Sequence, residues 1–407
     1  MWLASGISNI GDGVILGAVP VLVASNLTNN PILISSTVGI TVASRVIASL
    51  PAGVWVDRHP RKRIFFRVSL ARGAIVALIG LLLAADRLNI AALWVLLAGL
   101  SAGEAFADAA SVAMLPEIVE DDHLVRANAR LISTLTLTND MIGISIGPWL
   151  LVHIALSAPF FIDGVSFVCA AFLILAVRTR PQHQAREVIE RAVGEAKPST
   201  YRQYKADITE CVRFLKLHPA ARAFVLTAFP SNLASGALIG TFVLYARDWL
   251  HLEPQYYGLL LLFMAIGLVI GSFAAERGMA LVKDVRWILA IVLVCEGLSD
   301  LVIGITHSVP LVFAMNVVGG ISVGIFIVAG ATVRQQLTPK ELQGRMQSTY
   351  ALLGQSSIPL GTVLGGAMVG WFDVRTPLLF SAFVLIACGL LVANVTNKTR
   401  LATLMAQ

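Results

Sequence analysis

The stretch Gly53-Val54-Trp55-Val56-Asp57-Arg58-His59-Pro60-Arg61-Lys62-Arg63 joins two long apolar runs and holds a glycine, one acid and a dense basic cluster. Apolar runs of about 20 residues are long enough to cross a bilayer as helices. A basic cluster alone is typical of any cytoplasmic loop of a membrane protein. The glycine and the acid at fixed places ahead of the cluster indicate that this loop has a more specific role.

The composition of the whole 407-residue chain agrees with a membrane protein. Apolar residues make up 57% of it and charged residues only 13%, with a mean hydropathy of +0.80. Soluble domains carry roughly 25% charged residues, and a single hydrophobic core stops growing near about 250–300 residues. A soluble enzyme, a disordered chain and a disulfide scaffold are therefore excluded.

The remaining composition gives no sign of a cofactor, a metal or nucleic acid. The four cysteines are scattered without a pairing or metal-binding spacing. The net charge of +6 comes from basic residues in short loops between apolar runs, so we expect no nucleic-acid partner. No phosphate-binding glycine loop or nucleophile elbow occurs, and we expect no enzyme activity.

Apolar runs read against glycine, proline and charge predict an all-α integral membrane fold with twelve spanning helices. Six of them form a domain over residues 1–177 and six a domain over residues 222–407, with a polar linker at 178–221. Residues Tyr204, Ile208, Val212 and Leu215 lie at helical spacing in the linker, which predicts an amphipathic helix on the membrane surface; a plain linker helix is the alternative. The predicted spans are 3–25, 33–56, 65–85, 90–114, 128–152, 158–177, 222–247, 256–275, 286–305, 309–332, 346–370 and 376–395.

The distribution of Lys and Arg predicts the orientation. Three basic residues (Arg87, Arg247 and Arg375) fall in loops on one side and two (Arg45 and Arg72) inside spans, which leaves 25 of the 30 on the other side. By the positive-inside rule both termini and the linker face the cytoplasm. We expect a monomer in the cytoplasmic (inner) membrane of a bacterium.

The two halves are internal copies of one another. Residues Ser8–Gly17 align with Ser231–Gly240 at an offset of 223, and Gly53–Arg58 fall on Gly271–Glu276 at an offset of 218. Two six-helix repeats of the same orientation are typical of secondary transporters.

The opening stretch resembles the signature loop of the major facilitator superfamily, G-x-x-x-D-R-x-x-R-[KR]-[KR], in its expected place between spans two and three. Gly11-Asp12-Gly13, Leu115-Pro116-Glu117 and Gly344-Arg345 are similar to the branch of enterobactin exporters and macrolide-efflux proteins. The span-five motif of efflux antiporters is kept at Gly143, Gly147 and Pro148 and lost further on, where Leu151 and Val152 replace two glycines.

The resemblance implies a proton-coupled exporter of an amphipathic small molecule such as a drug, siderophore or secondary metabolite. A lysophospholipid flippase of the same fold is one alternative, and a membrane receptor or scaffold that transports nothing is another. The resemblance also implies a cytoplasmic gate, in which an anionic Asp57 faces the positive N-terminus of span eleven. A loop that only fixes topology would explain the basic residues but not Asp57. The predicted gate residues are Gly53, Asp57, Arg58, Arg61, Lys62, Arg63 and Arg345.

Charges inside the spans are the candidates for proton coupling, because each costs about 2.5–3.5 kcal/mol at the centre of a helix in the bilayer. Asp12 and Arg45 both lie near mid-depth, and the repeat places the uncharged Ser235 and Phe263 at their equivalents. We therefore predict that Asp12 carries the proton with Arg45 as its partner; a purely structural ion pair is the alternative. Glu104 and Asp140 are further candidates.

Two more groups of residues are predicted from the spans. Aromatic and polar side chains suited to the wall of a substrate cavity are Asn9, Phe106, Trp149, Asn232, Phe242, Met264 and Gln355. Small or bent positions suited to close helix contacts are Gly143, Gly147, Pro148, Gly361 and Gly365.

Overall fold

The computed structural model describes the chain except for residues 1, 120–122, 178–218, 282–284, 338–353 and 396–407. All regular structure in the described part is helical. The helices in chain order are α1 (Trp2–Leu22), η1 (Val23–Leu27), α2 (Pro31–Arg58), α3 (Arg61–Ala84), α4 (Ile90–Ile118), α5 (Leu124–Leu135), η3 (Thr136–Gly143), α6 (Ile144–His153), α7 (Ala158–Leu175), α10 (Pro219–Asp248), η4 (Pro254–Tyr256), α11 (Tyr257–Leu281), α12 (Val285–Ile305), α13 (Val309–Leu337), α15 (Ser357–Trp371) and α16 (Thr376–Val395).

The predicted all-α membrane fold is confirmed. Eleven helices of the described chain are long and apolar enough to cross a membrane. A shorter apolar helix, Ser357–Trp371, takes the place of the predicted eleventh span, whose residues 346–353 fall outside the described part. The predicted amphipathic helix and the rest of the 178–218 linker also lie outside it.

Most of the helices are apolar on nearly all sides, as expected of helices that face lipid outward and neighbours inward; α5 is amphipathic, with Arg126 and Arg130 exposed. Large apolar side chains point away from the protein along many of them; Phe273 is 78% exposed and Phe383 is 74% exposed. Span five departs from a regular helix, because the eight residues of η3 form a π-helix between α5 and α6.

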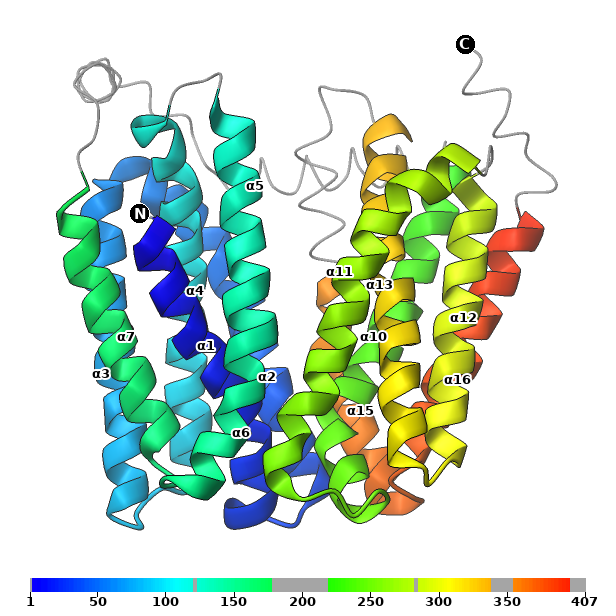
Figure 1. Cartoon of the computed structure of the whole chain (residues 1–407), viewed down its shortest axis with the longest axis horizontal. Coiled ribbons are helices and arrows are strands. Elements are labelled where there is room, and N and C mark those ends of the chain that lie inside the picture. The colour runs from blue at the N-terminus through cyan, green and yellow to red at the C-terminus, as the bar shows by residue number, and fades with distance from the viewer. Residues whose placement is uncertain (1, 120–122, 178–218, 282–284, 338–353, 396–407) are drawn as a thin grey trace. The chain divides into compact units, whose positions relative to one another are not determined.

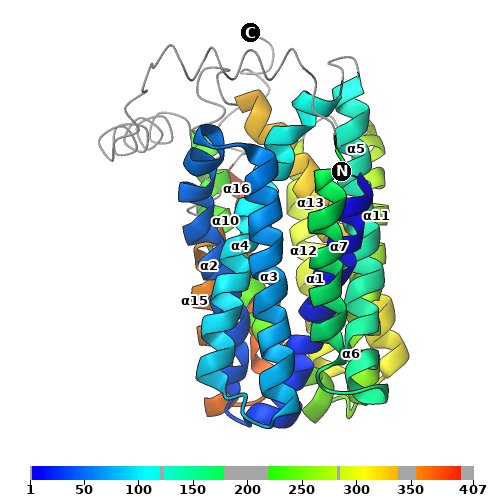
Figure 2. The ribbon, with the colours of Figure 1, turned by 90° about the vertical axis from the view of Figure 1, so that its left-hand side faces the viewer.

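The chain divides into two compact units, one of Met1–Leu22 with Ile40–Tyr201 and one of Val23–Gly39 with Arg202–Gln407. In the first unit α7 lies beside both α1 and α3, and α3 also lies beside α4, as Figures 1 and 2 show. In the second unit α10 packs against α15 and α16, and α11 packs against α13.

Glycines bring α1 and the fifth span into backbone contact in the first unit. A Cβ atom at Gly143 would overlap the carbonyl of Ile10, and one at Gly147 would overlap the carbonyl of Val14. Pro148 lies against Gly17 in the same contact. Only residues without side chains allow two helices to approach this closely.

The second unit repeats this contact. A Cβ atom at Gly361 would overlap the carbonyl of Leu233, and one at Gly365 would overlap the carbonyl of Ala237. Gly361 follows Gly143 at the offset of 218 on which the sequence repeat depends. The repeat therefore preserves a specific helix contact as well as the order of the spans.

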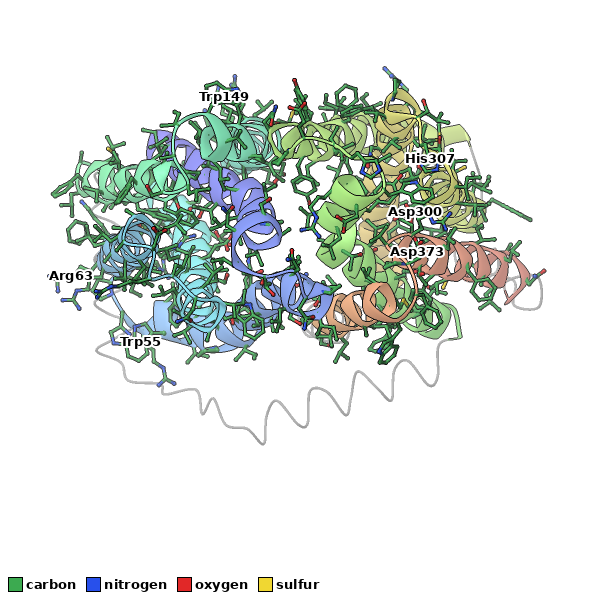
Figure 3. All side chains as sticks on the ribbon, turned by 90° about the horizontal axis from the view of Figure 1, so that it is seen from below. Trp55, Arg63, Trp149, Asp300, His307 and Asp373 are labelled. Carbon is green, nitrogen blue, oxygen red and sulfur yellow. The ribbon has the colours of Figure 1, made fainter. Side chains whose placement is uncertain are left out.

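Loops at one end of the second unit are joined by polar and aromatic contacts. The Arg375 guanidinium lies 4.0 Å from the centre of the Trp249 ring, which stacks on His307. Arg375 also donates to Asp373 at 2.9 Å, and these hydrogen bonds hold the pKa of the Asp373 carboxyl below its usual range. Figure 3 shows His307 and Asp373 at this end of the unit.

Candidate functional site

A buried ion pair joins α1 to α3 in the first unit. The Asp12 Oδ1 atom lies 2.6 Å from Arg72 Nη2, and the two side chains are 13% and 5% exposed. The guanidinium also lies 4.3 Å from the centre of the Phe167 ring on α7. On α4, a Cβ atom at Gly103 would press against the Arg72 side chain, so a glycine there leaves room for the arginine.

The predicted partner of Asp12 is therefore wrong: the pair is Asp12–Arg72 and not Asp12–Arg45. Depth in the bilayer can be counted along a sequence, and it places both arginines inside spans. Which helix faces which is decided by packing, and here α1 and α3 both contact α7.

A second acid, Asp163 on α7, lies beside this pair and is fully buried. Its Oδ1 atom accepts a hydrogen bond from Ser166 Oγ at 3.0 Å, whereas its Oδ2 atom has no hydrogen-bond partner in the described structure. A Cβ atom at Gly11 would overlap both the Asp163 carboxyl and the Ser166 hydroxyl. The glycine next to Asp12 thus lets α1 lie directly against this carboxyl.

The charges of this cluster do not balance when both acids are ionised. Arg72 pairs directly with Asp12, and Asp163 is close enough to interact electrostatically with both, so the cluster holds two carboxyls and one guanidinium. An ionised carboxylate buried without a partner costs so much free energy that the group takes up a proton instead. The cluster is neutral when one of the two carboxyls holds a proton.

Asp163 is the functional candidate that the sequence analysis missed. It is the only acid in the predicted span 158–177, and an ionisable residue within a span is the same signal that selects Asp12.

Arg45 belongs to a second cluster, between α2 and α4. It lies 3.0 Å from Glu104 and 2.7 Å from Asp108, which are one helical turn apart on α4. The side chains are 52%, 26% and 52% exposed respectively. Glu104 and Asp108 both interact electrostatically with Asp12, so a charge change in one cluster affects the other.

Asp140, the remaining candidate, lies apart from these clusters in the π-helix η3 and is half-buried. Isolated π-helical turns are frequent at functional sites. Next to it, the Asn139 backbone packs against Gly13 of α1.

The second unit does not repeat the charges. The contacts of Gly73 with Gly164 in the first unit and of Gly297 with Ala382 in the second make α3 equivalent to α12 and α7 equivalent to α16. This equivalence places Glu296 where the first unit has Arg72, and Ser381 where it has Asp163. Ser381 donates to Asp300 at 2.7 Å. Among the described residues of the second unit, the buried arginine of the first unit thus has no counterpart.

Two basic residues of the predicted gate loop, Arg61 and Lys62, join the start of α3 to neighbouring helices. Arg61 Nη1 donates to the carbonyl of Ala113 at 3.0 Å, which joins the start of α3 to α4. Lys62 Nζ donates to the carbonyls of Leu175 and Val177, at 2.6 and 2.8 Å, at the end of α7. Cations near helix C-termini satisfy the last carbonyls and oppose the negative end of the dipole.

The other residues of the predicted gate show no such contacts within the described part of the chain. Arg58 and Arg63 are exposed, and a Cβ atom at Gly53 would meet nothing within 4 Å. The Asp57 side chain and the whole of Arg345 lie outside the described part of the chain. The gate therefore stays a prediction.

The predicted cavity residues are spread over both units. Phe242 is buried in the second unit and stacks on Tyr245, with a ring-centre distance of 5.8 Å. Asn232 donates to the carbonyl of Ala228 on its own helix at 2.9 Å. Trp149 is 49% exposed and points away from the helices of the first unit in Figure 3.

Of the remaining cavity candidates, Asn9, Phe106 and Met264 are half-buried and Gln355 is exposed. A cavity that all seven residues share stays a prediction. No group of three or more His, Cys, Asp or Glu side chains that could hold a metal ion occurs within the described residues.

Two units of apolar spanning helices with charges buried inside one of them define a polytopic membrane protein of the transporter class. The chain belongs to the Major Facilitator Superfamily, whose sequence profile matches residues 1–275 and 224–402. The family and the fold are those of membrane transporters rather than of enzymes.

A relative of similar length is the uncharacterized MFS-type transporter YvqJ of Bacillus subtilis (strain 168). It is 23% identical over 356 residues, which are 87% of this chain and 81% of that protein.

Three solved structures share the fold. A bacterial homologue of the human lysosomal transporter Spinster, inward-facing and occupied, has a TM-score of 0.74 at 14% identity and covers 97% of this chain and 96% of its own. The nucleoside transporter NupG has a TM-score of 0.73 at 12% identity, over 97% and 98% of the two chains. A bacterial homologue of the iron transporter ferroportin has a TM-score of 0.71 at 17% identity, over 98% of each chain.

Proposed function

We propose that this transporter is a proton-coupled exporter that exchanges protons for an amphipathic small molecule by alternating access. The observation that carries the proposal is the buried cluster of Asp12, Arg72 and Asp163. Three ionisable groups inside a membrane domain are costly, and such groups commonly form proton relays in transporters.

The cluster suits proton exchange because it holds two carboxyls and one guanidinium. Arg72 is paired with Asp12, and the Oδ2 atom of Asp163 has no hydrogen-bond partner in the described structure, which supports Asp163 as the carboxyl that holds a proton. When water reaches the cluster, it stabilises a second negative charge and the proton leaves. When the cluster is dry again, one carboxyl must regain a proton from the side to which the transporter is open.

We propose that the substrate and the proton compete for the open transporter. A substrate that displaces water from the cluster also removes the water that stabilises a second negative charge. A positively charged substrate replaces that stabilisation with its own charge, and the proton can then leave the cluster. The second unit has Glu296 and Asp300 in its corresponding helix but no arginine between them in the sequence, which supports an exchange site in the first unit.

The cellular location and the orientation in the membrane are also proposed here. We propose the bacterial cytoplasmic membrane with both termini inside, because 25 of 30 basic residues fall on one side of the predicted spans. Membership of the branch of enterobactin exporters and macrolide-efflux proteins is likewise proposed on the motifs in spans one, four and five.

The test compares uphill and downhill transport in proteoliposomes. Substrates are first selected from a panel of amphipathic compounds by the rise that each causes in the thermal unfolding midpoint. The variants Asp12→Asn and Asp163→Asn each keep one acid and one guanidinium, so both are expected to fold. Each should lose accumulation driven by a pH gradient and keep downhill equilibration.

The matched control is Glu276→Gln, which removes an exposed acid from α11. It should transport as the unmodified protein does. Accumulation against a gradient that persists in both Asp12→Asn and Asp163→Asn would contradict the proposal. Loss of both modes together with the fold would instead assign the cluster a structural role.

A further inference from the structure

A groove of about 590 Å³ opens on the first unit where α2 ends, α3 begins and α4 passes behind them. It is lined by three basic side chains (His59, Arg63 and Arg67) and by apolar ones that include Trp55, Val68 and Phe106. Figure 3 shows Trp55 and Arg63 at the outer edge of this unit, away from the centre of its helices.

The basic side of the groove is unpaired. Arg63 and Arg67 are one helical turn apart on α3, so they share a face, and both are exposed. Neither has a hydrogen-bond or ion-pair partner among the side chains that the structure describes. His59 uses Nδ1 in a contact with the Trp55 carbonyl at 3.0 Å, which leaves its Nε2 atom for a ligand. None of the described residues that line the groove is an acid.

The apolar side of the groove is an aromatic surface. Trp55 is 55% exposed and stacks on His59, with ring centres 4.6 Å apart and planes 13° from parallel. The candidate membrane span of α3 begins at Arg61, so the groove lies at the end of a span. Tryptophan is enriched at this level of membrane proteins, where one end of its ring is apolar and the other wet.

We propose that this groove binds an anionic phospholipid of the adjoining leaflet. Its phosphate pairs with Arg63 and Arg67, and the upper part of an acyl chain lies along Trp55, Val68 and Phe106. Basic pockets between spanning helices bind acidic lipid headgroups in this way. Two guanidinium groups with no acid among the described lining residues favour phosphatidylglycerol over a zwitterionic lipid, whose own cation they would repel.

The bound lipid also supports the loop that joins α2 to α3. The bound headgroup contacts His59 and Arg63, which flank the turn that joins α2 to α3. The lipid therefore braces the predicted gate loop from the membrane side. This role is independent of proton coupling, and neither depends on the other.

The test uses quenching of tryptophan fluorescence by brominated lipids. The protein is reconstituted in vesicles of phosphatidylcholine with an increasing fraction of brominated phosphatidylglycerol, and then in vesicles with brominated phosphatidylcholine instead. The difference in emission between the unmodified protein and Trp55→Phe isolates the signal of the groove.

The variant Arg63→Gln/Arg67→Gln should lower the preference of the groove for phosphatidylglycerol roughly 30-fold, because each basic residue contributes about 1 kcal/mol near an anionic lipid and 1.4 kcal/mol is tenfold. The matched control is Arg126→Gln/Arg130→Gln on α5, which removes two exposed arginines at the same spacing outside the groove. It should leave the preference within about threefold of the starting value. Size-exclusion profiles and unfolding midpoints establish that both variants are folded.

Three results would overturn the proposal. The first is equal quenching of Trp55 by the two brominated lipids, and the second is an equal loss of preference in the control variant. The third is full reversal of the quenching by inorganic phosphate, which would assign the groove to a soluble anion. A lipid held by its acyl chain resists that competition.

Discussion

Replacing Arg72 by glutamine removes the cation from the buried cluster and leaves Asp12 and Asp163 without it. The Arg72 side chain is only 5% exposed and lies 2.6 Å from Asp12. Removing one partner of a buried pair costs about 3–5 kcal/mol, because the other charge stays buried without compensation. The loss of the contact with the Phe167 ring, at 4.3 Å, acts in the same direction.

The assay is thermal unfolding of the purified protein in detergent. At about 2–4 °C for each kcal/mol in a domain of this size, Arg72→Gln should lower the midpoint by roughly 6–20 °C. Arg45→Gln is the matched control, because Arg45 is 52% exposed in its ion pairs. Exposed pairs contribute about 0.2–1 kcal/mol, so its midpoint should fall by only a few degrees.

Variants of the two acids, Asp12 and Asp163, test whether the loss of the cation in particular destabilises the protein. Asp12→Asn and Asp163→Asn each leave a cluster of one acid and one cation, and both should be more stable than Arg72→Gln. A midpoint of Arg72→Gln within a few degrees of that of Arg45→Gln would show that the buried cation does not stabilise the fold. A midpoint of Asp12→Asn as low as that of Arg72→Gln would show the same.

Three further predictions concern packing, the gate and the topology. Gly147→Ala should lower the free energy of unfolding by about 1–3 kcal/mol through overpacking, because its Cβ would overlap a carbonyl of α1. Gly370→Ala should leave it unchanged, because nothing lies within 4 Å of its Cβ, and equal unfolding midpoints of the two variants would contradict the close contact at Gly147. Asp57→Asn should lengthen distances between spin labels on the cytoplasmic ends of α5 and α15, and unchanged distances would reject the gate. In a cysteine-free background, His251→Cys should react with an impermeant thiol reagent from outside and a cysteine at position 190 should not; the reverse pattern would invert the orientation.

The fold could be predicted from sequence because its signals are local. A span shows itself as an apolar run of sufficient length, and the loop from Gly53 to Arg63 has a spacing that composition alone does not produce. The repeat offset of 218 residues even relates Gly143 to Gly361, which make equivalent contacts in the two units.

The candidate site could be predicted only in part, because it depends on how helices rotate and pack. Sequence indicates that Asp12 lies deep in the membrane, and the structure buries it. Sequence gives no rotation of one helix about its axis relative to another, so depth in the membrane selects Arg45 as the partner, although Arg72 is the residue that contacts α1. Asp163 carries the same signal as Asp12, an acid within a span. Asp163 can lie close to Asp12 because Gly11 has no side chain in the space that the Asp163 carboxyl fills, and this contact cannot be predicted from the sequence.

On the proposed function, the buried cluster gives up a proton when substrate binds. Proton release can be measured in weakly buffered detergent solution near neutral pH, on addition of a compound selected by the thermal-shift panel. Linkage between the two ligands predicts release of about one proton for each substrate bound by the unmodified protein and by Glu276→Gln. The variant Asp163→Asn, which keeps the Asp12–Arg72 pair, should bind substrate and release none. Substrate binding without proton release in the unmodified protein, or undiminished release in Asp163→Asn, would contradict the proposed exchange.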